Sequence, residues 1–148
     1  MISTDSAAQM ETIEFASKGE NITKVERLID ELCEKHHIQE EHYGNILIAL
    51  TEAVNNAIYH GNKQDPEKKV ILRYAADEDN FRFVIEDEGP GFDFENVPDP
   101  TAPENIEKPN GRGVFLMRHL SDNIEFSEEG RIVEMEFSNL SKPVSVDA

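Results

Sequence analysis

The amino-acid sequence predicts an α+β fold, a two-layer sandwich in which helices cover one face of a mixed, mostly antiparallel sheet. Three observations support this prediction. Segments of strand and helix periodicity follow one another in the order strand, helix, helix, strand, strand, long loop, helix, strand, strand. Short polar turns join consecutive strands, so hairpins outnumber parallel βαβ units. The chain of 148 residues has no internal repeat and suits one domain.

The first two elements are predicted to be a short strand and a helix. Residues 1–10 are small and polar, and we expect a flexible leader there. Glu11–Ala16 alternates between apolar and polar residues, which indicates a strand. A helix is expected from about Thr23 to His36, because Thr23 and Glu26 fit a capping box and apolar residues then recur at helical spacing.

A second helix is predicted from about Glu40 to His60. An apolar stripe with helical spacing marks its buried face. Gly61 and Asn62 would end this helix, since glycine and asparagine tolerate the positive φ that often follows a last helical turn.

Glu52 and Asn56 are the first candidate site residues, and they lie on the polar face of this helix. They are four residues apart, so they are neighbours on one surface. A carboxylate and an amide held on a rigid helix suit a base beside a metal or phosphate site, whereas a merely solvated face would carry the same residues without function. Tyr59 and His60 lie one turn further along and would either line the same pocket or serve only at the helix end.

A strand hairpin follows, and a carboxylate ends its second strand. Lys69–Ala75 and Phe81–Asp87 both alternate, and Asp87 shares its face with the apolar residues of its strand. A buried carboxylate is costly unless something donates a hydrogen bond to it. Backbone amides could do so, but Gly89 and Gly91 follow directly and would permit a tight turn or the close approach of a ligand.

A long loop is expected over about residues 92–110, because this stretch has four prolines, many acidic residues and little periodicity. Loops of this length in compact domains are usually functional lids or disordered segments. Gly111, Arg112 and Gly113 come next and open an apolar run that predicts a short helix through Leu120.

The last two strands are predicted at Asn123–Ser127 and Arg131–Ser138, with a hairpin turn at residues 128–130. We expect a flexible tail over residues 139–148. The predicted folded domain therefore spans residues 11–138.

Composition restricts the classes of function. The formal net charge of −17 argues against direct nucleic-acid binding, which needs basic patches. The single cysteine, Cys33, excludes an internal disulfide, and its place in a helical stripe predicts a core residue and not a reactive thiol. No apolar run approaches the ~20 residues of a membrane span, and no signal peptide is evident, so a cytoplasmic protein is the default expectation.

Three motifs together resemble those of a known superfamily. They are TEAVNNAIYHGN, IEDEGPGFD and GRGVFLMRHLSD, which begin at Thr51, Ile85 and Gly111. In this order and on these elements they resemble the N, G1 and G2 boxes of the Bergerat-fold (GHKL, histidine-kinase-like) ATPases, and within these the small anti-sigma-factor serine/threonine kinases. The resemblance covers roughly residues 11 to 138 and implies the Bergerat ATP-binding fold.

The resemblance implies roles for the residues that would hold the nucleotide. Asp87 would accept a hydrogen bond from the exocyclic amine of adenine, and Gly89 and Gly91 would let the backbone lie against the base. Asn56 would bind Mg²⁺ through its side-chain oxygen, which is a ligand type that Mg²⁺ prefers. In many relatives a threonine follows the last hairpin glycine, whereas Arg131 stands here.

The resemblance also implies roles around the triphosphate. Gly111 and Gly113 would expose amide donors to the phosphates at a helix N-terminus, and Arg112 would add a cationic contact. Glu52 would be the general base that takes the proton from an attacking hydroxyl.

As a whole, the resemblance implies an ATP- and Mg²⁺-dependent serine/threonine kinase that phosphorylates an antagonist protein, sequesters a sigma factor and forms a homodimer. Two other hypotheses stay open. One is a nucleotide-gated binding module with little kinase activity, and the other is a detached histidine-kinase catalytic domain. A P-loop enzyme is not indicated, because the pattern G-x-x-x-x-G-K-[ST] is absent.

Overall fold

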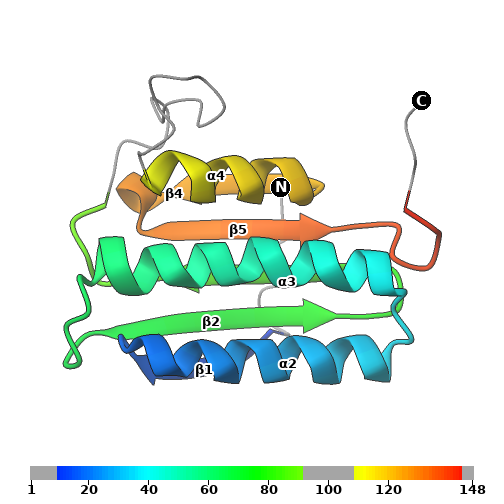
Figure 1. Cartoon of the computed structure of the whole chain (residues 1–148), viewed down its shortest axis with the longest axis horizontal. Helices are drawn as coiled ribbons and strands as arrows, with labels where there is room; N and C mark the ends of the chain where they lie inside the picture. Colours follow the sequence, from blue (N-terminus) through cyan, green and yellow to red (C-terminus); the bar gives the residue numbers. More distant parts are fainter. Residues whose placement is uncertain (1–9, 92–108, 145–148) are drawn as a thin grey trace.

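The computed structural model describes residues 10–91 and 109–144, which form a sheet with its helices on one face (Figure 1). The strands are β1 (Glu11–Ala16), β2 (Lys69–Ala76), β3 (Phe81–Glu86), β4 (Asn123–Ser127) and β5 (Ile132–Phe137). The helices are α2 (Ile22–Lys35), α3 (Glu40–Asn55) and α4 (Pro109–Leu120), with short turns η1 (Gly19–Asn21), η2 (Asn56–Gly61) and η5 (Glu128–Gly130).

The sheet has five strands in the order β1-β2-β3-β5-β4, and every neighbouring pair is antiparallel. The predicted α+β sandwich with helices on one face is therefore confirmed. The sequence predicted a mixed sheet, but all neighbouring strands within the described residues are antiparallel. The crossover through α4 places β4 outside β5, so β3 pairs with β5 and not with β4.

The core lies between the sheet and the helices. Alternate residues of the central strands point into it, as Phe81, Phe83 and Ile85 do on β3. The rings of Phe81 and Phe83 pack edge to face with centroids 6.1 Å apart, an arrangement that aromatic pairs favour. Cys33 is buried in this core as predicted, and its burial raises the pKa of the thiol to about 11.

The predicted capping box at the start of α2 does not form. The helix begins at Ile22, and the residue before it, Asn21, makes no side-chain cap. The preceding turn η1 runs directly into the helix, so Thr23 lies inside the first turn. There its hydroxyl donates to the carbonyl of Glu20 at 2.9 Å.

The predicted end of the second helix is also wrong in its geometry. At Asn56 the helix changes from α to π hydrogen bonding, and the π turn continues to Gly61. Asn62 keeps helical angles (φ −82°, ψ −7°), and its amide donates to the carbonyl of Ala57 at 2.8 Å. The left-handed φ falls one residue later, at Lys63. π turns in α-helices often occur at functional sites, and this one begins at a predicted metal ligand.

The helix predicted from Gly111 begins two residues earlier, at Pro109. The predicted lid, residues 92–110, lies outside the described residues up to 108, as do the leader over residues 1–9 and the last four residues of the chain. No helix in the described part of the chain is long and apolar enough to span a membrane.

The first residues of the predicted C-terminal tail pack against the domain. Leu140 is buried in the core, and its amide donates to the carbonyl of Asp79 at 2.9 Å. The hydroxyl of Ser141 donates to the Asp79 carboxylate at 2.6 Å. The packed domain therefore extends past the predicted boundary at residue 138, because the turn between β2 and β3 supplies partners that local sequence patterns do not reveal.

We expect Leu140→Ala to lower the free energy of unfolding by about 2–5 kcal/mol, the usual cost of truncating a buried leucine. Denaturant unfolding would measure this loss. Lys142→Ala is the matched control, because Lys142 is exposed in the same segment and should change stability by less than about 0.5 kcal/mol. A loss below that size for Leu140→Ala would contradict the packing of this segment.

Candidate functional site

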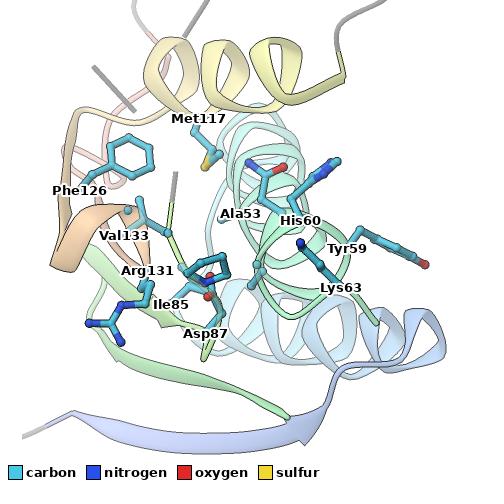
Figure 2. A pocket seen from close by; sticks show the side chains of 16 residues that line it. Ala53, Tyr59, His60, Lys63, Ile85, Asp87, Met117, Phe126, Arg131 and Val133 are labelled. Carbon is cyan, nitrogen blue, oxygen red and sulfur yellow. The ribbon is translucent and has the colours of Figure 1, made fainter. Parts of the chain in front are cut away.

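A cavity of about 470 Å³ opens between the end of the second helix, the loop after β3, α4 and the β4–β5 hairpin. Figure 2 shows apolar side chains around it, Met117 from α4 above and Phe126 and Val133 from the β4–β5 hairpin on the left, with Asp87 below. The other lining residues are Ala53, Asn56, Ala57, Tyr59, His60, Gly61, Lys63, Ile85, Pro90, Gly91, Gly130 and Arg131.

Asp87 directly follows β3 and borders the cavity together with Ile85, whose face it was predicted to share. Its amide continues the sheet by donating to the carbonyl of Arg131 at 3.0 Å. Its Oδ1 accepts a hydrogen bond from the amide of Gly89 at 2.7 Å. Burial raises the pKa of the Asp87 carboxyl above its ordinary value, and the Gly89 amide and the Arg131 guanidinium only partly oppose this shift. The carboxylate is therefore a desolvated acceptor.

The backbone around Asp87 is packed so closely that side chains are excluded. A Cβ at Gly89 would lie 2.1 Å from the carbonyl oxygen of Gly61. Gly91 has φ +86°, and a Cβ there would lie 2.2 Å from the carbonyl oxygen of Glu129. The close approach at these two residues is that of the protein's own backbone, and the approach of a ligand stays a prediction.

Gly61 has a role that the sequence analysis did not identify. A Cβ at this position would lie 2.4 Å from Cγ of Asp87, so the carboxylate rests directly on the Gly61 backbone. The π turn η2 brings Gly61 to this place. A glycine after a helix is usually assigned to capping, and nothing in the local pattern distinguishes that role from contact with a residue 26 positions later.

Glu52 and Asn56 meet α4 at Gly113. A Cβ on Gly113 would lie 3.1 Å from Oε2 of Glu52 and 3.3 Å from both terminal atoms of the Asn56 side chain. The predicted neighbours on one helical face therefore share a contact with the predicted third motif. Asn56 lines the cavity, whereas Glu52 lies beside it at the contact between α3 and α4.

The three residues that were predicted to open α4 lie at different positions within it. Gly111 is the third residue of the helix, so its amide is among the first-turn donors without an intrahelical acceptor. Gly113 is the fifth, so its amide has an acceptor within the helix, and the predicted free donor at Gly113 is replaced by the close packing described above. Arg112 is exposed and is not among the residues that line the cavity.

Basic residues at the cavity come from positions that the sequence analysis did not assign to phosphate binding. They are His60, Lys63 and Arg131. Arg131 is tied to Glu128 by an ion pair of 3.5 Å and points outward, as Tyr59 does on the opposite side (Figure 2). Lys63 reaches the rim because of its left-handed φ of 53° after the π turn, which no sequence signal predicts.

The apolar residues that α4 and the β4–β5 hairpin contribute to the cavity follow from the sequence pattern. Met117 is four residues after Gly113, so both lie on one face of α4. Phe126 pairs directly with Val133 across the β4–β5 hairpin, and alternation places both on the inner face. The sequence pattern does not reveal that the inner face of the β4–β5 hairpin meets the end of the second helix.

The arrangement defines a site with two chemically distinct parts. One part is an apolar slot with a single desolvated carboxylate, which suits a flat heteroaromatic ring that donates a hydrogen bond. The other part holds a carboxylate, an amide and a helix start beside the same cavity. Within the described residues, no group of three or more His, Cys, Asp or Glu side chains is placed to hold a metal ion.

Comparison with known proteins agrees with this description of the fold. A family model described as the histidine kinase-like ATPase domain matches residues 15–137, and the chain belongs to this family.

The curated relatives are named as kinases. The chain is 34% identical over 95 residues to "Serine-protein kinase RsbW" of Bacillus cereus strain AH187, a match that covers 60% of this chain and 59% of the relative. It is 32% identical over 88 residues to the protein of the same name from Bacillus subtilis strain 168, covering 54% of each. The match thus spans less than two thirds of these relatives.

A solved structure shares the fold. The crystal structure of the RsbU and RsbW domains of Rv1364c from Mycobacterium tuberculosis superposes with a TM-score of 0.61 at 15% identity. The match covers 93% of this chain and 35% of that one. At this identity the likeness shows a common fold.

Proposed function

We propose that this chain is a Mg²⁺- and ATP-dependent protein serine/threonine kinase that phosphorylates an antagonist protein and also sequesters a sigma factor. The observation that carries the proposal is that Asp87 and Asn56 line one cavity, and that Asn56 and Glu52 meet Gly113 directly beside it. Membership in an ATPase family and likeness to proteins named serine-protein kinases support it.

The adenine ring would occupy the apolar slot. Its exocyclic amine would donate to the Asp87 carboxylate, and its faces would contact the apolar side chains Met117, Phe126 and Val133. The desolvation of Asp87 favours this pairing, because a charged acceptor in an apolar site gains more from a donor than it would in water. Gly89 and Gly91 hold the loop that presents the carboxylate.

The phosphates would extend toward the start of α4. The amide of Gly111 is oriented by its place in the first helical turn, and Arg112 is exposed in the same turn. Asn56 would hold Mg²⁺ by its side-chain oxygen, since Mg²⁺ commonly takes few protein ligands together with phosphate oxygens. When bound, Mg²⁺ would neutralise phosphate charge. Lys63 at the rim is a further cation within the site.

Glu52 would act as the general base. As a serine or threonine oxygen bonds to the γ-phosphorus, the bond between that phosphorus and the β–γ bridging oxygen breaks and ADP leaves. Glu52 would take the hydroxyl proton during this step. Its carboxylate lies beside Asn56 across Gly113, so the base and the phosphate-binding end of the site are adjacent.

The proposed partners are proteins. The net charge of −17 suits a partner with a basic surface and does not suit direct nucleic-acid binding. A cytoplasmic location and a homodimer complete the proposal, and both come from the family resemblance and not from a contact in the structure.

The experiment that tests this function incubates the protein with γ-labelled ATP, Mg²⁺ and an extract of the source cell. We expect one small labelled protein, with the label on serine or threonine. Absence of label despite ATP binding, in an extract first treated with phosphatase, would favour the nucleotide-gated binding module. A label on histidine would favour a histidine-kinase catalytic domain.

We expect Gly61→Ala to weaken ATP binding by about tenfold, because the new methyl group would displace the Asp87 carboxylate from its position 2.4 Å away. Isothermal titration calorimetry with Mg-ATP would measure the change. Gly44→Ala is the control, since a Cβ there meets nothing within 4 Å and should leave affinity unchanged while raising stability by up to about 1 kcal/mol. Equal ATP affinities in the two variants would refute this contact.

A further inference from the structure

Two buried polar side chains, Ser17 and Asn62, bond to each other beneath the site. Within the described residues they are the polar side chains that are buried, at 0% and 1% exposure. Nδ2 of Asn62 donates to Oγ of Ser17 at 2.7 Å and to the carbonyl of Lys69 at 3.0 Å. The Ser17 hydroxyl donates in turn to the carbonyl of Lys68 at 2.9 Å. Buried polar groups are retained only when they are paired, and this pair is satisfied on both sides.

The other end of the Asn62 side chain reaches the loop that carries Asp87. Oδ1 of Asn62 accepts a hydrogen bond from the amide of Glu88 at 2.7 Å. Glu88 lies between Asp87 and Gly89, whose amide donates to the Asp87 carboxylate. The peptide that directly follows Asp87 is therefore fixed by a side chain from the end of the second helix.

A second contact fixes the same loop. The carboxylate of Glu88 accepts a hydrogen bond from the amide of Lys69 at 2.7 Å, at the start of β2. Together with the packing of Gly61 on Asp87, these contacts leave the loop little freedom to rotate. Asn62 is the member of this set that links the residue after strand β1, strand β2 and the loop at once, through Ser17, Lys69 and Glu88.

We propose that Asn62 is a positioning residue for recognition of the base, and that Ser17 holds Asn62 in its working orientation. This inference rests on the proposed function, because it assumes that Asp87 accepts a hydrogen bond from the exocyclic amine of adenine. A carboxamide is suited to the task, since it donates at one end and accepts at the other. It thereby aims the Asp87 carboxylate without contacting the nucleotide.

A merely structural role would also make Asn62 sensitive to mutation, because removing a buried hydrogen-bonding side chain leaves its partners unpaired. Loss of stability therefore does not test the proposal. The discriminating quantity is base preference. Inosine triphosphate differs from ATP in carrying a carbonyl where adenine has its amine, so the ratio of the two affinities reports on Asp87 and not on the triphosphate contacts.

The experiment measures the Kd for Mg-ATP and for Mg-inosine triphosphate, at a temperature well below the melting point of each variant. We expect Asn62→Ala to reduce the preference for ATP by about tenfold and to change inosine triphosphate affinity little. Ser17→Ala is the milder second variant and should reduce the preference in the same direction. Asn21→Ala is the control, because the Asn21 amide donates to the carbonyl of Ala16 at 2.7 Å and does not contact the loop.

The outcomes separate this inference from the proposed function. Asp87→Ala is measured alongside as the reference variant. If Asp87→Ala lowers the preference and Asn62→Ala and Ser17→Ala both match the Asn21→Ala control, Asn62 is only structural and the inference is overturned. If Asp87→Ala itself leaves the preference unchanged, the adenine assignment fails, whatever the Asn62 variant does.

Discussion

Glu52→Ala is expected to lower the rate of phosphoryl transfer by a factor of about 10² or more while leaving Mg-ATP affinity nearly unchanged, because general bases contribute on this scale. The rate of transfer and the affinity for ATP should respond differently because of where Glu52 lies. Glu52 touches Gly113 beside the cavity, whereas it is not among the residues that line the cavity itself. Single-turnover transfer to the antagonist protein and calorimetric titration of ATP would measure the two quantities.

Two variants sharpen this test. Glu52→Gln keeps the shape of the side chain in the narrow space beside Gly113 but cannot take the proton, so it should be as slow as the alanine variant. Glu41→Ala removes an exposed carboxylate from the first turn of the same helix and should transfer phosphate at the parent rate. Undiminished transfer by both Glu52 variants would make this residue an ordinary surface acid.

The residues that sequence analysis placed correctly are those whose positions follow from local periodicity. Glu52 and Asn56 are four residues apart on a helix, so one turn brings them together wherever that helix packs. Asp87 continues the alternation of Phe83 and Ile85, so its direction follows from the strand alone. For these residues the short-range rule and the tertiary packing agree.

The residues that sequence analysis missed depend on contacts between distant segments. Asn62 and Gly61 looked like helix-ending residues, and their contacts with Glu88 and Asp87 arise only when β3 lies beside the end of the helix. Lys63 reaches the cavity through a left-handed turn that follows a π-helical stretch. A π turn is poorly favoured in isolation, so tertiary contacts must select it.

The same distinction applies to the boundaries of the fold. Strands β1 and β4 begin and end where alternation predicted, because each pairs along its whole length with a neighbour. The capping box at Thr23 does not form, and Leu140 packs into the core beyond residue 138, because η1 and the turn at Asp79 offer partners that compete with the local signals. At Thr23 the competing partner is local, the carbonyl of Glu20, whereas at the tail it is Asp79, which is 62 residues away from Ser141 in the sequence.

Asp87→Asn is expected to act in opposite directions on binding and on stability. The new side chain can still accept the Gly89 amide, but its NH₂ group would face the amine of adenine donor to donor. We expect ATP affinity to fall by about a hundredfold, since the hydrogen bond lost is to a charged acceptor and a donor is left unpaired. Calorimetric titration with Mg-ATP would measure this loss.

The nucleotide-free Asp87→Asn variant should be more stable than the parent at neutral pH. Burial raises the pKa of Asp87 in the folded protein, so the folded state binds more protons than the unfolded state between the ordinary and the raised pKa. The parent therefore loses stability as the pH rises through that window, and the loss is complete above the raised pKa. Asparagine carries no charge, so the Asp87→Asn variant does not lose stability in this way.

Thermal unfolding without nucleotide, from neutral pH down to a pH below the ordinary pKa of aspartic acid, would follow this difference. The advantage of Asp87→Asn should be largest at neutral pH and should disappear once the parent carboxyl is protonated in both states. Glu78→Gln is the control, because this exposed carboxylate lies in the turn between β2 and β3 and its replacement should change the melting temperature little. If the parent is more stable than Asp87→Asn at neutral pH, the fold stabilises the charged carboxylate. That result would contradict the inference that burial of this charge destabilises the nucleotide-free protein.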